Sequence, residues 1–302
     1  MLTIAKWAWV ILVLGGAVYF FISHFKETLS YLRLVSVVNL VISLIFLVVG
    51  RILQTQLAKA ALQGQSFRPP FTRMLHIFSM TQLAKYLPGG LWQFVARFGV
   101  YQANGMTPVQ SGRVMLVENL WLVLSAGFFG AMSGFQFLLN WMKIPSGMSS
   151  LVGWIGLILA AWFATLWLID RYAGLQRHSL SWFLIYLIPL QIANWFINGL
   201  SFWILLPSNE HPLSLIWVSI SAFCISYVFG FIAIWAPSGI GVREVVLSYL
   251  MGIYISPQAA IIYGTLNRII WVFTDMMLGL FCELFYGTGK LASIVKMKEP
   301  SR

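Results

Sequence analysis

The sequence predicts an all-α polytopic membrane protein, and its composition is the first of three observations that support this prediction. Charged residues make up 9% of the 302 residues, whereas a soluble domain carries about 25%. Apolar residues reach 60%, so too few polar side chains are left to cover a surface that faces water. Composition therefore argues against a soluble enzyme, a nucleic-acid-binding module and a disordered protein.

The second observation is the length of the apolar runs, since a helix needs about 20 residues to cross a membrane. The runs that meet this length are 4–23, 31–50, 111–133, 150–169, 180–206, 213–235 and 257–286. Two more stretches, 74–105 and 236–254, are apolar but interrupted by proline, glycine and charge. We interpret them as broken or re-entrant helices, because irregular backbone persists at membrane depth only where protein or a wet cavity satisfies its polar groups. About eight membrane segments follow if one of these stretches crosses.

The third observation is an internal match at a constant offset of 149 residues. The matching pairs are Pro88 and Pro237, Gly90 and Gly239, Thr107 and Ser256, Pro108 and Pro257, Ser125 and Thr274, and Gly130 and Gly279. The offset is nearly half of the chain and predicts two structural repeats; the alternative is chance matching among abundant glycine and proline. Many transporters contain such repeats, with the substrate site at their interface. Parallel and inverted repeats both stay open.

The chain is organised as one integral membrane domain, residues 1–302, without a soluble module. Its parts are two N-terminal spans (1–72), a first repeat core (74–140), connecting spans (150–235), a second repeat core (236–286) and a basic tail (287–302). Basic residues in the 51–73 loop and in this tail are typical of cytoplasmic segments. We therefore expect both termini in the cytoplasm and an even number of crossings.

The candidates for charges at membrane depth are six residues within apolar stretches: Glu118, Arg243, Glu244, Arg268, Asp275 and Glu283. A charge deep in the bilayer costs at least ~2.5 kcal/mol, so such residues usually face a bundle interior or a cavity. Arg268 and Asp275 are two helical turns apart and share a face. If the two halves face each other, Glu118 is expected to pair with Arg268. Such a pair either holds helices together or faces a substrate.

The residues from Pro237 to Glu244 combine flexible positions with an arginine near a helix start. Free N–H groups at a helix N-terminus and a guanidinium both suit a phosphate, so Gly239, Gly241 and Arg243 are candidate anion-binding residues. Their looser counterparts in the first half are Lys85, Gly89, Gly90 and Arg97. The alternative is that glycine and proline here serve only packing and kinks.

The remaining residue patterns indicate packing more than binding or catalysis. Gln191, Asn194 and Asn198 follow one helical face and predict interhelical hydrogen bonds or a wet cavity. Cys224 and Cys282 lack a CxxC or histidine partner, so we expect small buried side chains. No histidine cluster or GxxxxGK[ST] motif is present, and we expect no metal, cofactor or ATP hydrolysis.

The segments KYLPGGLWQFVARFGVYQANGMTP, VENLWLVLS, APSGIGVREVVLSYLMG and NRIIWVFTD resemble signature segments of the lysylphosphatidylglycerol synthase transmembrane family. The resemblance runs from about Arg73 to Phe285. The matching residues are Lys85, Pro88, Gly89, Gly90, Arg97, Glu118, Asn119, Pro237, Gly239, Gly241, Arg243, Glu244, Arg268 and Asp275. Ser238 stands where the family commonly has glycine. The family's soluble aminoacyltransferase domain has no counterpart here, so lysyl transfer is not expected.

The resemblance implies a flippase or scramblase in the cytoplasmic membrane of a prokaryote, moving a phospholipid or polyprenyl-phosphate-linked glycolipid between leaflets. Glycines and cations would bind the headgroup, while Glu118, Glu244 and Asp275 would balance charge or carry protons. The expected partners are this lipid and a glycosyltransferase or other lipid-modifying enzyme. The alternatives are a membrane-embedded enzyme acting on a lipid-linked substrate, a transporter of a small anionic solute, and a partner protein without transport activity.

Overall fold

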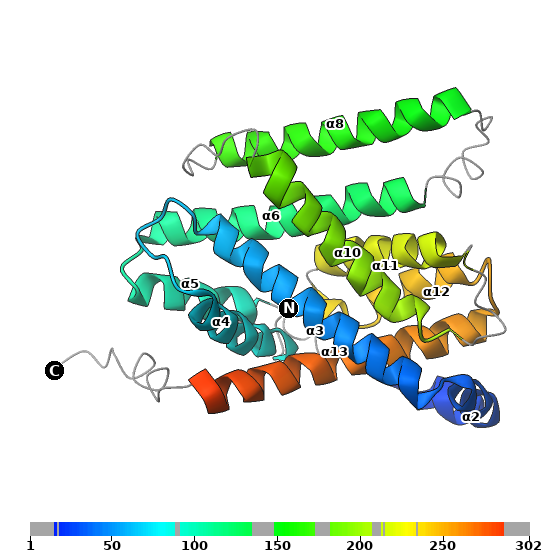
Figure 1. Ribbon diagram of the computed structural model, residues 1–302. Coiled ribbons are helices and arrows are strands. Elements are labelled where there is room, and N and C mark those ends of the chain that lie inside the picture. The colour runs from blue at the N-terminus through cyan, green and yellow to red at the C-terminus, as the bar shows by residue number, and fades with distance from the viewer. Residues whose placement is uncertain are drawn as a thin grey trace.

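The computed structural model describes residues 15–16, 18–87, 91–134, 148–172, 182–206, 213, 215–233 and 235–286, and every regular element in these ranges is a helix. The longer helices are α2 (Phe25–Leu34), α3 (Val37–Ala61), α4 (Phe71–Leu83), α5 (Trp92–Ala103), α6 (Pro108–Ser133), α8 (Met148–Tyr172), α10 (Ile188–Trp203), α11 (Leu215–Ile232), α12 (Val242–Met251) and α13 (Pro257–Tyr286). Three short helical pieces are η1 (Ala84–Tyr86), η2 (Phe183–Leu187) and η4 (Pro237–Gly239). Figure 1 shows their arrangement.

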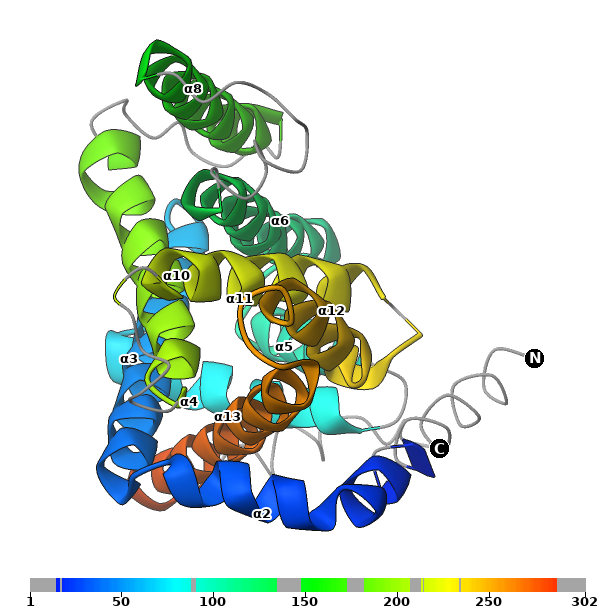
Figure 2. The same ribbon diagram turned by 90° about the vertical axis from the view of Figure 1, so that its right-hand side faces the viewer.

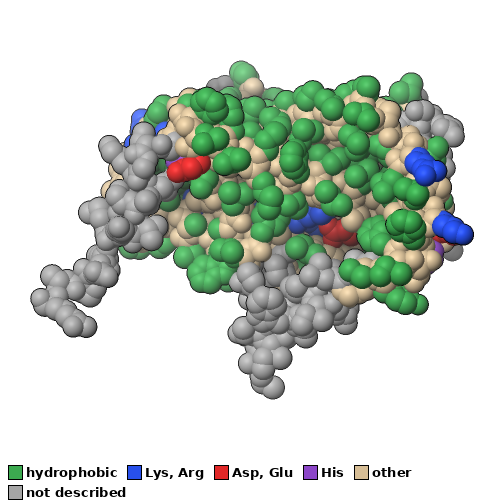
Figure 3. Space-filling view, turned by 90° about the horizontal axis from the view of Figure 1, so that it is seen from below, with side chains coloured by type: hydrophobic (Ala, Val, Ile, Leu, Met, Phe, Trp, Pro, Cys, Tyr) green, Lys and Arg blue, Asp and Glu red, His purple; other side chains and the backbone are tan. Residues whose placement is uncertain are grey.

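Five helices of the described chain are long and apolar enough to cross a membrane: α3, α6, η2 continued by α10, α11 and α13. The outer surface is correspondingly apolar, and Figure 3 shows a face covered largely by hydrophobic side chains. Apolar side chains on the outside are typical of a protein solvated by lipid. The all-helical class predicted from the sequence is therefore confirmed for the described residues, with five candidate membrane-spanning helices.

Most of the predicted apolar runs contain a helix with nearly the same bounds, but the second run does not. The run 31–50 was expected to end before a basic loop, whereas α3 begins at Val37 and continues to Ala61. Arg51 and Lys59 therefore lie in a helix instead of a loop. A helix can continue through polar residues when contacts with other helices provide hydrogen-bond partners for their side chains. Most of the first run, 4–23, lies outside the described residues.

Each interrupted stretch contains a short helical piece, η1 or η4, ahead of a longer helix. In the first, α4 and η1 precede α5; in the second, α11 leads through η4 into α12. In Figure 1, α4 and α5 lie at one end of the molecule, and α11 and α12 lie at the other. Ser238, Gly239 and Gly241 have positive φ angles of 54°, 71° and 86°, which reverse the chain direction between α11 and α12.

Local sequence sets several helix starts. Thr107 caps α6 by accepting a hydrogen bond from the N–H of Gln110, and Pro108 occupies the first helical position. Ser256 Oγ accepts from the N–H of Ala259, and α13 also begins with a proline. A hydroxyl N-cap followed by proline is a strong helix start because the proline lacks only an N–H that would be unpaired there.

Close helix packing and buried polar contacts connect the centre of the bundle. A Cβ at Gly50 of α3 would lie 2.5 Å from the Asn198 side chain of α10, so glycine permits this crossing. Gln191 Oε1 accepts from the indole N–H of Trp162 at 3.1 Å, which confirms the predicted interhelical hydrogen bond for Gln191, whereas Asn198 donates to Asn194 within α10. Cys224 and Cys282 are buried and unpaired, as expected. Figure 2 shows α8 at the outer edge and α2 across the opposite side.

Candidate functional site

A cavity of about 230 Å³ lies where the two interrupted stretches meet. The pieces η1 and η4 contact each other, and both contribute to its wall. Its polar lining comes from both halves of the chain and includes Arg51, Gln82, Lys85, Gln93, Asn119 and Arg243. The chain thus places its irregular backbone and several cations around one internal space.

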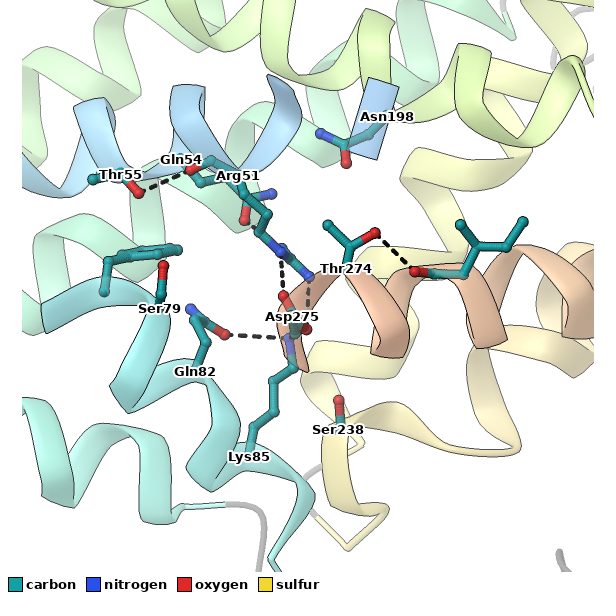
Figure 4. Close-up of polar contacts among 12 residues, drawn as sticks. Arg51, Gln54, Thr55, Ser79, Gln82, Lys85, Asn198, Ser238, Thr274 and Asp275 are labelled. Atoms are coloured by element: carbon teal, nitrogen blue, oxygen red, sulfur yellow. Dashed lines mark hydrogen bonds and ion pairs between the residues drawn. The ribbon is translucent and has the colours of Figure 1, made fainter. Parts of the chain in front are cut away.

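Asp275 on α13 is the centre of a buried charge cluster beside this cavity. Its carboxylate accepts hydrogen bonds from Arg51 at 2.5 Å (Nε) and 3.0 Å (Nη2). Lys85 Nζ lies 2.6 Å away, and Tyr86 Oη donates at 2.6 Å. Figure 4 shows Arg51 and Lys85 converging on Asp275 from different helices. Two cations share one carboxylate here, so the cluster carries excess positive charge.

A second buried ion pair joins Arg97 of α5 to Glu118 of α6. Arg97 also donates from Nε to Thr81 Oγ1 at 3.1 Å. The predicted pairing of Glu118 with Arg268 is therefore wrong. The cause is helix packing, because α5 folds back against α6 within the same half and places Arg97 next to Glu118.

Arg268 instead binds the irregular segment between α11 and α12, through Ser238. Its Nη2 donates to the Ser238 carbonyl oxygen at 2.5 Å and to Ser238 Oγ at 2.7 Å. Its Nε lies 3.6 Å from Glu244 Oε1. Because Arg268 and Asp275 share a face of α13, one helix contacts both interruptions, Ser238 through Arg268 and η1 through Asp275.

Arg243 is buried against aromatic rings and lines the cavity. Arg243 is 9% exposed. Its guanidinium carbon lies 4.9 Å from the centre of the Tyr227 ring and 4.8 Å from the centre of the Trp271 ring. Within the described part of the chain, it has no hydrogen bond and no ion pair. Gly230 leaves room for it, since a Cβ there would overlap the Arg243 side chain.

The charges around the cavity do not cancel. Among the described residues at the cavity and its ion pairs, five basic side chains, Arg51, Lys85, Arg97, Arg243 and Arg268, stand against three carboxylates, Glu118, Glu244 and Asp275, which leaves a formal charge of two positive units. Desolvated cations in excess attract an anion more strongly than the same cations in water. An anionic group is therefore the ligand that best suits this cavity.

The backbone N–H groups that the sequence suggested as anion donors are already hydrogen-bonded within the chain. The N–H of Gly239 donates to the Ala236 carbonyl at 2.9 Å, and the N–H of Gly241 donates to Glu244 at 2.7 Å. Both donors are thus used within the chain, and neither is free to hold an anion. Gly89 and Gly90 lie outside the described residues. Glu283 lies apart from the cavity and pairs with His76 at 2.9 Å.

The sequence-based prediction missed Arg51 as a residue of the candidate site because it placed the end of the helix at Gly50. One signal was available: Arg51 follows a long apolar run directly, with Ile52 and Leu53 after it. No group of histidine, cysteine or acidic residues that could hold a metal ion occurs among the described residues.

No protein-family model matches this sequence, and a search among curated proteins also finds no match. The chemistry of the cavity is therefore the basis for assigning a function.

Proposed function

We propose that this protein moves a lipid with an anionic or sugar-bearing headgroup between the two leaflets, as a flippase or scramblase. The headgroup, a phosphate in the simplest case, enters the central cavity while the acyl or prenyl chains stay in the membrane. The observation that carries this proposal is Arg243, a buried guanidinium that lines the cavity and pairs with no carboxylate among the described residues.

An unpaired buried cation is unfavourable unless it has a partner part of the time. Burial of a charge costs several kcal/mol, and contacts of about 0.5–2 kcal/mol with aromatic rings offset only a part of this. A guanidinium presents donors in a planar fork that matches a phosphate. The position of Arg243 is thus explained if a phosphate group occupies the cavity during part of the cycle.

The size of the cavity supports a headgroup as ligand. Its volume of about 230 Å³ lies below the roughly 300–1,000 Å³ of pockets that enclose a drug-sized molecule. A complete lipid does not fit, so the chains must lie outside. Leu91, at the edge of the cavity, is 50% exposed and offers an apolar surface to such chains.

The proposal includes two inverted repeats related by the offset of 149 residues. Shifted by this offset, α5 falls on 241–252 and α6 on 257–282, close to α12 (Val242–Met251) and to the first part of α13 (Pro257–Tyr286). The end of α4 falls on the end of α11. In Figure 1, α6 and α13 run in opposite directions, which favours the inverted arrangement. Inverted repeats commonly place a substrate site at their interface.

We further propose that the chain is a member of the lysylphosphatidylglycerol synthase transmembrane family in a prokaryotic inner membrane, with eight membrane segments and cytoplasmic termini. The resemblance of the two interrupted stretches supports the family. Arg68 and Arg73, next to the connection from α3 to α4, support a cytoplasmic location of that end. Glu118, Glu244 and Asp275 each contact a cation, which is consistent with a charge-balancing role.

Reconstitution into liposomes tests the function. Liposomes with and without the protein would carry trace fluorescent phosphatidylglycerol, phosphatidylcholine or a polyprenyl-phosphate sugar, and an impermeant quencher would report the exposed leaflet. We expect faster exchange of the anionic lipids than in protein-free liposomes. No acceleration under any ion gradient would refute the proposal. Uptake of inorganic phosphate without lipid exchange would identify a solute transporter, and a new lipid product would identify an enzyme.

A further inference from the structure

A second cavity of about 200 Å³ lies at the C-terminal end of α3 and shares no lining residue with the central cavity. Its walls come from the last turns of α3, from the connection to α4 and from the start of the helix formed by η2 and α10. Gln56 donates from Nε2 to Tyr186 Oη at 2.6 Å and joins α3 to η2 at this point.

The walls of this second cavity are basic. Lys59 and Arg68 line it, and none of the described residues that line it is acidic. The Lys59 side chain has neither a hydrogen bond nor an ion pair with any described residue. Arg68 donates from Nε to the Gln65 carbonyl oxygen at 3.2 Å, which leaves its terminal nitrogens available. Two cations with unused donors therefore face a space that contains no carboxylate.

The surface next to the cavity is apolar. Leu184 and Ile185, which lie between the lining residues Trp182 and Tyr186, are 53% and 77% exposed. Tryptophan and tyrosine are common at the level of lipid headgroups, where one side of the ring is apolar and the other is wet. The turn that carries Tyr186 is a short π-helix, a feature that is frequent at functional sites.

We propose that this cavity binds the headgroup of an anionic membrane phospholipid. Lys59 and Arg68 contact the phosphate, and the acyl chains lie along Leu184 and Ile185. A basic cavity with an apolar exposed flank at the end of a membrane helix matches the two parts of such a lipid, as in other basic pockets between membrane helices. This lipid is a bound component at one end of the protein and does not depend on transport through the central cavity.

Native mass spectrometry of the full-length protein in detergent micelles tests the proposal. Phosphatidylglycerol, phosphatidylcholine or inorganic phosphate is titrated against the wild type and against the double variant Lys59→Ala/Arg68→Ala. The matched control, Lys26→Ala/Arg33→Ala, removes two exposed cations from α2. We expect the cavity variant alone to lose phosphatidylglycerol affinity by roughly 30-fold, about fivefold for each cation. The charge-conserving variant Lys59→Arg/Arg68→Lys should retain binding.

The central cavity also binds anionic lipid under the proposed function, so the same titration is repeated with Arg243→Met. Binding that persists in Arg243→Met and disappears on adding the Lys59 and Arg68 substitutions assigns the lipid to the second cavity, whatever the outcome of the transport assay. Equal affinity of the wild type for phosphatidylglycerol and phosphatidylcholine would overturn the proposal. So would an equal loss in the α2 control, or displacement of the lipid by inorganic phosphate at the same concentration.

Discussion

Replacement of Arg243 by methionine separates a functional cation from a structural one. Methionine keeps the packing of the aliphatic part of the side chain, but it removes the charge, the donors and the contacts of the guanidinium with the surrounding rings. A guanidinium that only held helices together would have a carboxylate partner, and its loss would destabilise the protein. Arg243 has no such partner among the described residues, so we expect Arg243→Met to lose lipid exchange and to remain folded.

The magnitude follows from the contacts of Arg243. Hydrogen bonds from a charged donor to a phosphate contribute about 1.5–3 kcal/mol, which corresponds to a loss of roughly 10- to 150-fold in headgroup affinity. For stability, three aromatic contacts of about 0.5–1 kcal/mol each are lost, while burial of an unpaired charge, which costs several kcal/mol, is relieved. The unfolding temperature is therefore expected to stay the same or rise.

The assay is leaflet exchange of fluorescent phosphatidylglycerol in liposomes, with thermal unfolding in detergent measured on the same preparations. Arg113→Met is the matched control, because Arg113 is an exposed arginine on α6. We expect exchange to fall in Arg243→Met and to be unchanged in Arg113→Met. Normal exchange in Arg243→Met, or a large fall in its unfolding temperature, would refute the reasoning.

Four other substitutions, used in three experiments, test the surroundings of the cavity. Asp275→Asn removes the carboxylate shared by two buried cations and should lower the free energy of unfolding by about 3–5 kcal/mol, measured by denaturation in detergent. Arg97→Met should be similarly destabilising, whereas adding Glu118→Leu should recover most of the loss; additive losses in this double-mutant cycle would argue against the pair. Gly230→Ala places a Cβ against the Arg243 side chain and should reduce lipid exchange as Arg243→Met does, and unaltered exchange would show that the arginine need not hold its position.

The candidate site was only partly predictable from sequence because its pairings depend on which helices lie side by side. Glu118, Arg243 and Asp275 could be singled out, since each is a charge within an apolar stretch. The partner of Glu118 could not, because the choice between Arg97 and Arg268 depends on how α5 folds back on α6. Arg51 was assigned to a loop, since local sequence contains no sign of a carboxylate 224 positions away that stabilises the helix there.

Composition and apolar run length by themselves determined that the chain is helical, that it suits a membrane, and that a long helix, α13, begins at Pro257. These properties depend on local hydrogen bonding and on transfer of side chains from water, so each can be evaluated within a short segment. The tertiary structure alone decided that Asp275 has two cations, whereas Arg243 has no carboxylate partner among the described residues. The distribution of buried charge depends on distances between distant segments, because Coulomb interactions at low dielectric change steeply with position.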